Sequence, residues 1–284
     1  MIRSRVKSLG YAAAIALVSA SAQAVIVDGW QLNTTLSTLA PPSNTTNIGH
    51  LNLSGGNATV NQEVNGISMM PFVGAGFREF GEIFSITYTA ENCVGACDSG
   101  VPVLLSGAPA FALQLKFTDL AGVVTGFNPI TGALTYRFTP GVGTVVLGGT
   151  TTSGSPFTNL ANLQMGAPSG GGLNSFLSSI QSNGQSTITA KILAAGYTTG
   201  LLKDSLGVNF DPTLLLADIE TTNKISSAAT LAATCTFDLS KMCVSIGIRS
   251  DGSLDLTVPE PGMLALLGIA MAGLGFVARR KRAA

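Results

Sequence analysis

Apolar and polar residues alternate with a period of two along much of the chain. In residues 111–118 every second residue is large and apolar, and residues 82–89 and 134–138 repeat the pattern. This period places one face of a strand on a core and the other face in water, as in an antiparallel sheet. The pattern predicts a mainly β fold, an antiparallel, β-sandwich-like domain over residues 25–257.

Turn-forming residues are predicted to divide this sheet into hairpins. Gly55-Gly56 lies between two weakly alternating runs, and Asp251-Gly252 lies between residues 244–249 and 253–257. A glycine-containing pair between alternating runs is a strong short-range signal for a tight hairpin turn. We also expect a strand over residues 235–239.

Residues 156–223 have a mixed pattern. After Gly170-Gly171-Gly172, apolar residues recur at i, i+3, i+4 and i+7 over residues 173–180, and Asn183-Gly184 follows. This spacing predicts a short amphipathic helix. Asp211-Pro212 can begin another helical turn that extends to residue 217, whereas residues 186–192 alternate again. We therefore predict a partly helical insertion, of mixed helix and strand, within the β-domain.

The N-terminal residues have the three parts of a secretory signal peptide. Arg3, Arg5 and Lys7 form a basic region, residues 9–20 are an apolar stretch too short to span a membrane, and a small-x-small cleavage site follows. We expect cleavage at this site, which consists of Ala22, Gln23 and Ala24. Residues 1–24 are then removed, and the mature protein begins at Val25.

The C-terminal residues 258–284 also have three parts. Val258-Pro-Glu-Pro-Gly262 precedes an uncharged apolar run, residues 263–278, and four consecutive cations follow it. As a helix the run is roughly 24 Å long, slightly short for a bilayer core of about 30 Å. The cations mark the cytoplasmic end, and the two prolines keep Glu260 in an extended peptide at the opposite membrane surface. On these grounds alone a transmembrane helix is expected, either as a plain anchor or as a processing signal.

This three-part arrangement resembles the PEP-CTERM sorting signal of Gram-negative bacteria. The resemblance implies processing by an exosortase, a membrane-embedded protease-transpeptidase, after export through the Sec translocon. It also implies transient residence in the inner membrane, delivery to the cell surface or extracellular matrix, and an association with extracellular polysaccharide and, in some members, flocculation. The residues expected to direct sorting and processing are Pro259, Glu260, Pro261, Arg279, Arg280, Lys281 and Arg282.

The charge of the central region argues against nucleic acid as a partner. Residues 25–257 contain 8 of the 15 Lys and Arg residues and 14 of the 15 Asp and Glu residues, which gives a formal charge of 8 − 14 = −6. Nucleic-acid binding requires a basic patch. Of the aromatic residues that carry a polar atom, the region contains only Trp30 and three tyrosines. A row of exposed aromatic residues, expected of a carbohydrate-binding module, is therefore hard to form.

The four cysteines form two local pairs in the sequence, Cys93 with Cys97 and Cys235 with Cys243. Export to an oxidising compartment favours disulfides, and four cysteines allow three connectivities. We favour the two local disulfides, because Gly95 lets the shorter loop close and seven intervening residues suit a hairpin. A zinc site is the alternative, but these spacings differ from those of zinc fingers.

We expect no catalytic residue, cofactor or metal in the central region. His50 is the only histidine, and the chain has no Gly-x-Ser-x-Gly motif, so a surface role is favoured over a catalytic triad. Glu79, Glu82 and Glu91 are candidate hydrolase carboxylates, but Glu79 and Glu82 fall on opposite faces of a strand. Residues 251–255 resemble a calcium loop with too few acids, and Asn-x-Ser/Thr triplets occur at Asn33, Asn44, Asn52 and Asn57.

These observations together predict an exported, non-enzymatic component of extracellular matrix, biofilm or floc. Two alternatives remain open: a carbohydrate-binding surface module and, after it, a polysaccharide-active hydrolase. A binding protein retains its polymer without cleaving it, whereas a glycoside hydrolase needs two carboxylates about 5–10 Å apart in a cleft.

Overall fold

The computed structural model describes residues 24–33, 44–91, 104–105, 111–150, 157–176, 182–232 and 234–259. The chain divides into two units. One unit, Val27–Thr257, is called the body below. The other contains both ends of the chain, and only residues 24–26 and 258–259 of it are described. The apolar stretch of the predicted signal peptide, residues 9–20, and the predicted transmembrane helix, residues 263–278, lie outside the described residues.

The described residues are almost entirely β-structure. The single helical element is a 3₁₀ turn, η2 (Pro212–Leu214). The strands are β1 (Ala24–Ile26), β2 (Trp30–Asn33), β3 (Asn44–Val64), β4 (Gly76–Ile83), β5 (Ser85–Ala90), β6 (Leu104–Leu105), β7 (Phe111–Phe127), β8 (Leu134–Phe138), β9 (Thr144–Thr150), β10 (Thr158–Leu173), β11 (Asn183–Ile192), β12 (Leu202–Lys203), β13 (Leu216–Ala232) and β14 (Met242–Pro259).

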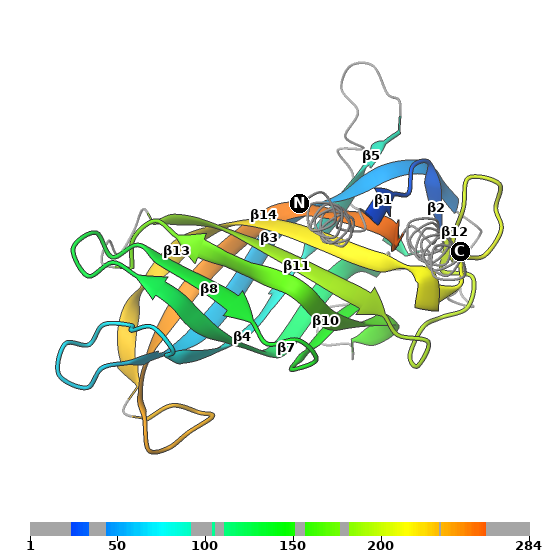
Figure 1. Cartoon of the computed structure of the whole chain (residues 1–284). Coiled ribbons are helices and arrows are strands. Elements are labelled where there is room, and N and C mark those ends of the chain that lie inside the picture. The colour runs from blue at the N-terminus through cyan, green and yellow to red at the C-terminus, as the bar shows by residue number, and fades with distance from the viewer. Residues whose placement is uncertain are drawn as a thin grey trace, which may run out of the picture. The chain divides into compact units, whose positions relative to one another are not determined.

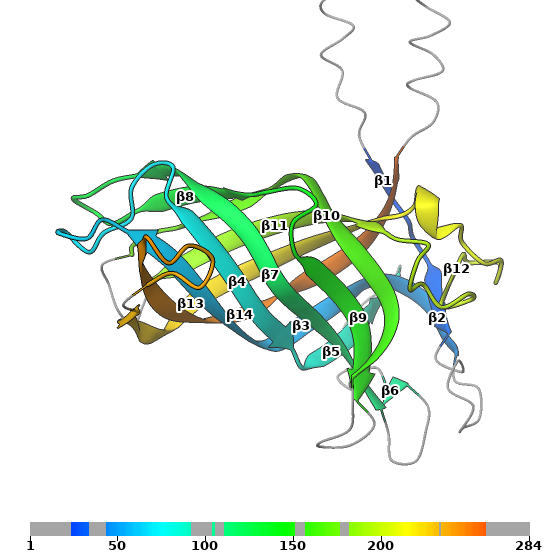
Figure 2. The same ribbon diagram turned by 90° about the horizontal axis from the view of Figure 1, so that it is seen from below.

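The body is one antiparallel sheet that closes on itself. Neighbours follow the order β14-β13-β11-β10-β8-β7-β4-β3, and β3 pairs again with β14, so eight strands form a closed ring (Figures 1 and 2). Strand β9 continues the position of β8 between β7 and β10. The predicted sandwich is therefore wrong. Alternation shows that one face of each strand is buried, but it does not show whether that face packs on a second sheet or on the far side of the same sheet.

The predicted partly helical insertion is also wrong. Residues 156–223 include β10, β11 and the first half of β13, which pair with one another along most of their lengths. Gly170-Gly171-Gly172, predicted as a break, lies inside β10 and pairs with both β8 and β11. The helical spacing that begins at Leu173 arises at the end of a strand, because Leu173 pairs with Gly184. Residues 174–176 are not helical, and residues 177–181 lie outside the described part.

Neither predicted glycine turn is a hairpin. Strand β3 continues through Gly55-Gly56, β14 continues through Asp251-Gly252, and the two sites lie opposite each other at a register shift. A Cβ on Gly56 would collide with the Ser250 carbonyl oxygen, and one on Gly252 would collide with the Glu220 carbonyl oxygen. These glycines therefore mark a β-bulge and a close approach of strands. The strand predicted over residues 235–239 is likewise absent, because this stretch is a loop.

Aromatic side chains fill one part of the interior of the closed sheet. Phe77, Tyr136 and Phe138 form a trio of edge-to-face contacts, with ring centroids 5.4–5.6 Å apart. The Phe77 ring lies where a Cβ on Gly122 would stand, and a Cβ on Gly171 would lie 2.8 Å from the Tyr136 hydroxyl. Glycine at these positions of neighbouring strands thus leaves space for the aromatic side chains. A larger residue there would overpack the core, which typically costs about 1–3 kcal/mol.

Among the described residues there is no helix of sufficient length and apolar character to cross a membrane.

Candidate functional site

A groove of about 1090 Å³ lies on the body. Strands β8, β10, β11, β13 and β14 form its base, together with the end of β7 and the segment that follows it. The register identifies the outward-facing side chains that line it. Thr135, Gly172, Gln185, Thr222 and Asp251 are successive partners across these strands. We call this feature the outer groove. Sequence analysis missed it, because its lining residues come from six separate stretches.

Small residues leave the outer groove open. Gly172 lies between Thr135 and Gln185 in the row of strand partners, and Gly126 pairs with Thr135 on the other side. A Cβ on Gly126 would lie 2.7 Å from the Thr135 hydroxyl. Two positions of the base therefore expose backbone instead of a side chain. Such positions allow a ligand to approach the sheet closely.

A second row of the outer groove carries positive charge. Asn183 pairs with Lys224, and Lys224 pairs directly with Arg249 on β14. Neither cation forms a hydrogen bond or an ion pair with any described residue, and all three ion pairs among those residues lie elsewhere. Asp251, two residues beyond Arg249, accepts a hydrogen bond from the Gly55 N–H at 3.0 Å. The groove thus contains two adjacent cations and one carboxylate.

Inside the ring, a buried polar cluster lies beside the aromatic trio. The Tyr136 hydroxyl is 2.6 Å from the Ser186 hydroxyl, which also accepts a hydrogen bond from the Asn223 side-chain amide. The hydroxyls of Thr221 and Ser250 donate to the Asn223 amide oxygen at 3.2 and 2.8 Å. This cluster ties β8, β11, β13 and β14 together, and each member has a partner.

Glu79 also points into the ring. Its Cα partners are Val60 and Leu120, which are both buried, and it lines two cavities of about 30 and 20 Å³. No hydrogen bond or ion pair joins its carboxyl group to a described residue. Burial raises the pKa of Glu79 from 4.5 to about 7. The pKa of Tyr136 is also raised, first by burial and then by the charge of Glu79. A carboxyl group without a polar partner is therefore held partly protonated near neutral pH.

The structure separates the three candidate hydrolase carboxylates. Glu79 faces the interior. Glu82 pairs with Asn57 and Lys116 and lies on the opposite, outward face of the sheet. Glu91 follows β5, where its backbone N–H donates to the Asn47 carbonyl. His50 lies on β3 opposite Thr89. The prediction that Glu79 and Glu82 point to opposite faces is confirmed.

The suggested calcium loop is part of a strand. Asp251 and Asp255 both belong to β14, and Asp255 pairs with Asp218 on β13. Burial, and to a lesser degree the charges of Glu220 and Asp218, raise the pKa of Asp255, while His50 lowers it. No group of three or more acidic, histidine or cysteine side chains within the described ranges could hold a metal ion.

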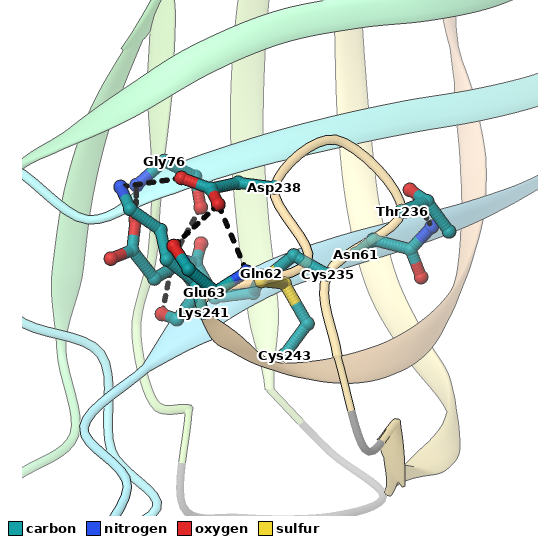
Figure 3. The surroundings of a disulfide bond; sticks show 10 residues. Asn61, Gln62, Glu63, Gly76, Cys235, Thr236, Asp238, Lys241 and Cys243 are labelled. Carbon is teal, nitrogen blue, oxygen red and sulfur yellow. Dashed lines mark hydrogen bonds and ion pairs between the residues drawn. A yellow bond between two sulfur atoms is a disulfide. The ribbon is translucent and has the colours of Figure 1, made fainter.

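A disulfide joins Cys235 and Cys243, with their Cα atoms 4.8 Å apart (Figure 3). This confirms one of the two predicted local pairs; Cys93 and Cys97 lie outside the described residues. The loop that the disulfide closes contacts the end of β3. The buried Glu63 carboxylate accepts a hydrogen bond from the Gly76 N–H at 2.9 Å and forms an ion pair with Lys241 at 3.0 Å.

Most of the predicted sorting residues lie outside the part of the chain that the structure describes. Pro259 ends β14, whereas Glu260, Pro261 and the four basic residues lie outside the described residues. Of the predicted signal-cleavage residues, Ala24 begins β1 and Ala22 is not described. Three of the candidate glycosylation sites, Asn44, Asn52 and Asn57, lie within the paired strand β3, and the fourth, Asn33, ends β2.

The C-terminal region is similar to a known protein family. Residues 257–282 match the family described as the PEP-CTERM protein-sorting motif. No curated protein and no solved structure matches the chain. The chain therefore carries a PEP-CTERM sorting motif, which implies an exported protein that an exosortase, a membrane enzyme, processes on its way to the cell surface.

Proposed function

We propose that this protein is a non-enzymatic component of the extracellular matrix, biofilm or floc that surrounds the cell. The observation that carries the proposal is the combination of the sorting motif with the outer groove. The motif directs the protein outward, and the groove gives the body a broad, open and polar binding surface. Such a surface suits retention of an extended polymer more than enclosure of a small substrate.

The second candidate function is that of a carbohydrate-binding surface module. The lining of the outer groove favours it, because Asn174, Asn183 and Gln185 have exposed side chains without a partner among the described residues. Each amide offers both donors and an acceptor, as sugar hydroxyls require. The aromatic contribution is small. Trp30 is fully buried, and within the described part of the chain Phe127 is the one aromatic residue that lines the groove.

The position of the carboxylates supports a role without catalysis. Asp251 is the one acidic side chain of the described residues that lines the outer groove, whereas glycoside hydrolysis generally needs a pair. The Glu79 carboxyl group lies inside the ring, among buried side chains of β3, β4 and β7. It therefore lies on the opposite face of the sheet from the outward-facing residues of the groove.

Cell fractionation tests the matrix role. Wild-type protein should be recovered with the washed extracellular matrix, and a deletion strain should form less biofilm or floc, restored by the gene in trans. Recovery only from the culture medium or the periplasm, with unchanged biofilm and floc in the deletion strain, would refute the proposal. To test for catalysis, the matrix polysaccharide is incubated with the purified protein, and its chain length should not change.

A further inference from the structure

We propose that the outer groove binds an acidic polysaccharide, and that Lys224 and Arg249 bind its carboxylate or sulfate groups. This inference rests on the proposed function, which it refines by naming the chemical class of the polymer. Lys224 and Arg249 are direct partners on β13 and β14, and both are exposed in the groove. Side chains in this relation lie about 5 Å apart at Cβ, so both can reach one anionic group.

The pairing of Lys224 with Arg249 is unfavourable for the fold alone. Like charges placed directly opposite each other across a sheet destabilise it, and no carboxylate among the described residues forms an ion pair with either cation. The body has only 8 cationic residues against 14 acidic ones, so two adjacent unpaired cations depart from its overall charge. Such local conflicts are expected where a functional site requires them. An anionic ligand would resolve this conflict.

The remaining lining identifies the ligand as a sugar polymer. Asn174, Asn183 and Gln185 add amide groups that have no partner among the described residues, and Gly126 and Gly172 leave the base open. Arginine matches a carboxylate or sulfate with two parallel N–H donors, and amides match hydroxyl groups. The groove therefore provides charge recognition and hydroxyl recognition side by side.

Two other anionic partners fit less well. An acidic peptide is most often added to a sheet as an extra strand, but β8, β10, β11, β13 and β14 are each paired on both sides along the groove. These strands thus offer no free edge. Nucleic acid requires an extended basic surface, whereas the body carries a net charge of −6 and only two cations among the described residues line the groove.

Binding by the purified full-length chain tests this inference. The probe is an oligogalacturonate of defined length, compared by calorimetry with a neutral malto-oligosaccharide of the same length. The variant Lys224→Gln/Arg249→Gln should bind the oligogalacturonate about tenfold more weakly or worse, because charge-assisted hydrogen bonds are lost. The matched control Lys191→Gln/Lys203→Gln makes the same change in net charge outside the groove and should bind as the wild type does. Circular dichroism establishes that both variants are folded.

Three results would overturn the inference. The first is equal binding by the groove variant and the control variant. The second is equal affinity of the wild type for the acidic and the neutral oligosaccharide, which would show that charge has no role. The third is that polyglutamate or a DNA duplex binds at least as tightly as the oligogalacturonate. If one of these results is obtained and the protein is still found in the matrix, only the groove inference fails and the matrix role is retained. If the protein is absent from the matrix, the matrix role is refuted, whatever the groove binds.

Discussion

Replacing Glu79 by glutamine should stabilise the body at neutral and alkaline pH. Glutamine has nearly the same shape as glutamate but carries no charge. In the folded protein burial raises the pKa of Glu79 from 4.5 to about 7, so the folded state holds a proton that the unfolded state releases. Between these two pH values the unfolded state binds fewer protons, and the stability of the wild type therefore falls as the pH rises.

The magnitude follows from the two pKa values. A change of one pKa unit corresponds to about 1.4 kcal/mol, so the rise from 4.5 to about 7 corresponds to roughly 3 kcal/mol. The contribution of Glu79 to stability is greatest below pH 4.5 and is lost by about pH 7. At pH 8 the Glu79→Gln variant should be more stable than the wild type by up to about 3 kcal/mol, less to the extent that solvent reaches the half-buried Glu79, and below pH 4.5 the two should be nearly equal.

Urea unfolding at a series of pH values measures this difference. Fluorescence of Trp30, the only tryptophan and fully buried, reports the transition. Glu82→Gln is the matched control on the same strand, and a substitution at such a position usually changes stability by no more than about 0.5 kcal/mol. A Glu79→Gln variant that is less stable than the wild type at pH 8 would refute the reasoning. It would mean that the ionised carboxylate has a stabilising partner.

Three further substitutions test other parts of the structure. Lys224→Gln should raise the free energy of unfolding by about 0.2–1 kcal/mol by removing a like-charge pair with Arg249, as measured by urea titration; a loss of stability would show that Lys224 has a stabilising role. Replacing both Cys235 and Cys243 by serine should lower stability by about 2–3 kcal/mol, because the disulfide closes a short loop, and an unchanged melting temperature would contradict this. Glu260→Ala should leave unprocessed precursor in the membrane fraction, whereas the wild-type protein outside the cell should lack the residues after the Pro-Glu-Pro segment in C-terminal mass spectrometry. Extracellular wild-type protein that ends at Ala284 would contradict processing.

The sequence by itself determined that the protein carries a sorting motif and that its central region is mainly β-structure. The sorting motif is contiguous, so its prolines, its apolar run and its cations can be recognised without any tertiary contact. Period-two alternation is also local, and it correctly predicted strands within β7 and over β8. The local disulfide between Cys235 and Cys243 followed from spacing and compartment.

Only the tertiary structure decided how the strands close and where the polar side chains meet. Gly55-Gly56 and Asp251-Gly252 have the composition of turns, but β3 and β14 continue through them, and the two sites lie opposite each other at a register shift. Leu173, where the helical spacing begins, likewise belongs to a strand, because it pairs with Gly184 of β11.

The candidate site depended on tertiary structure in the same way. Lys224 and Arg249 are ordinary solvent-facing residues of two separate strands, and only the register of β13 on β14 makes them partners. Glu79 was correctly assigned to the opposite face from Glu82. That its face is the interior of a closed sheet, where burial raises its pKa, follows from contacts between strands distant in the sequence. Strand registers and ring closure are properties of such long-range pairs, and no local pattern encodes them.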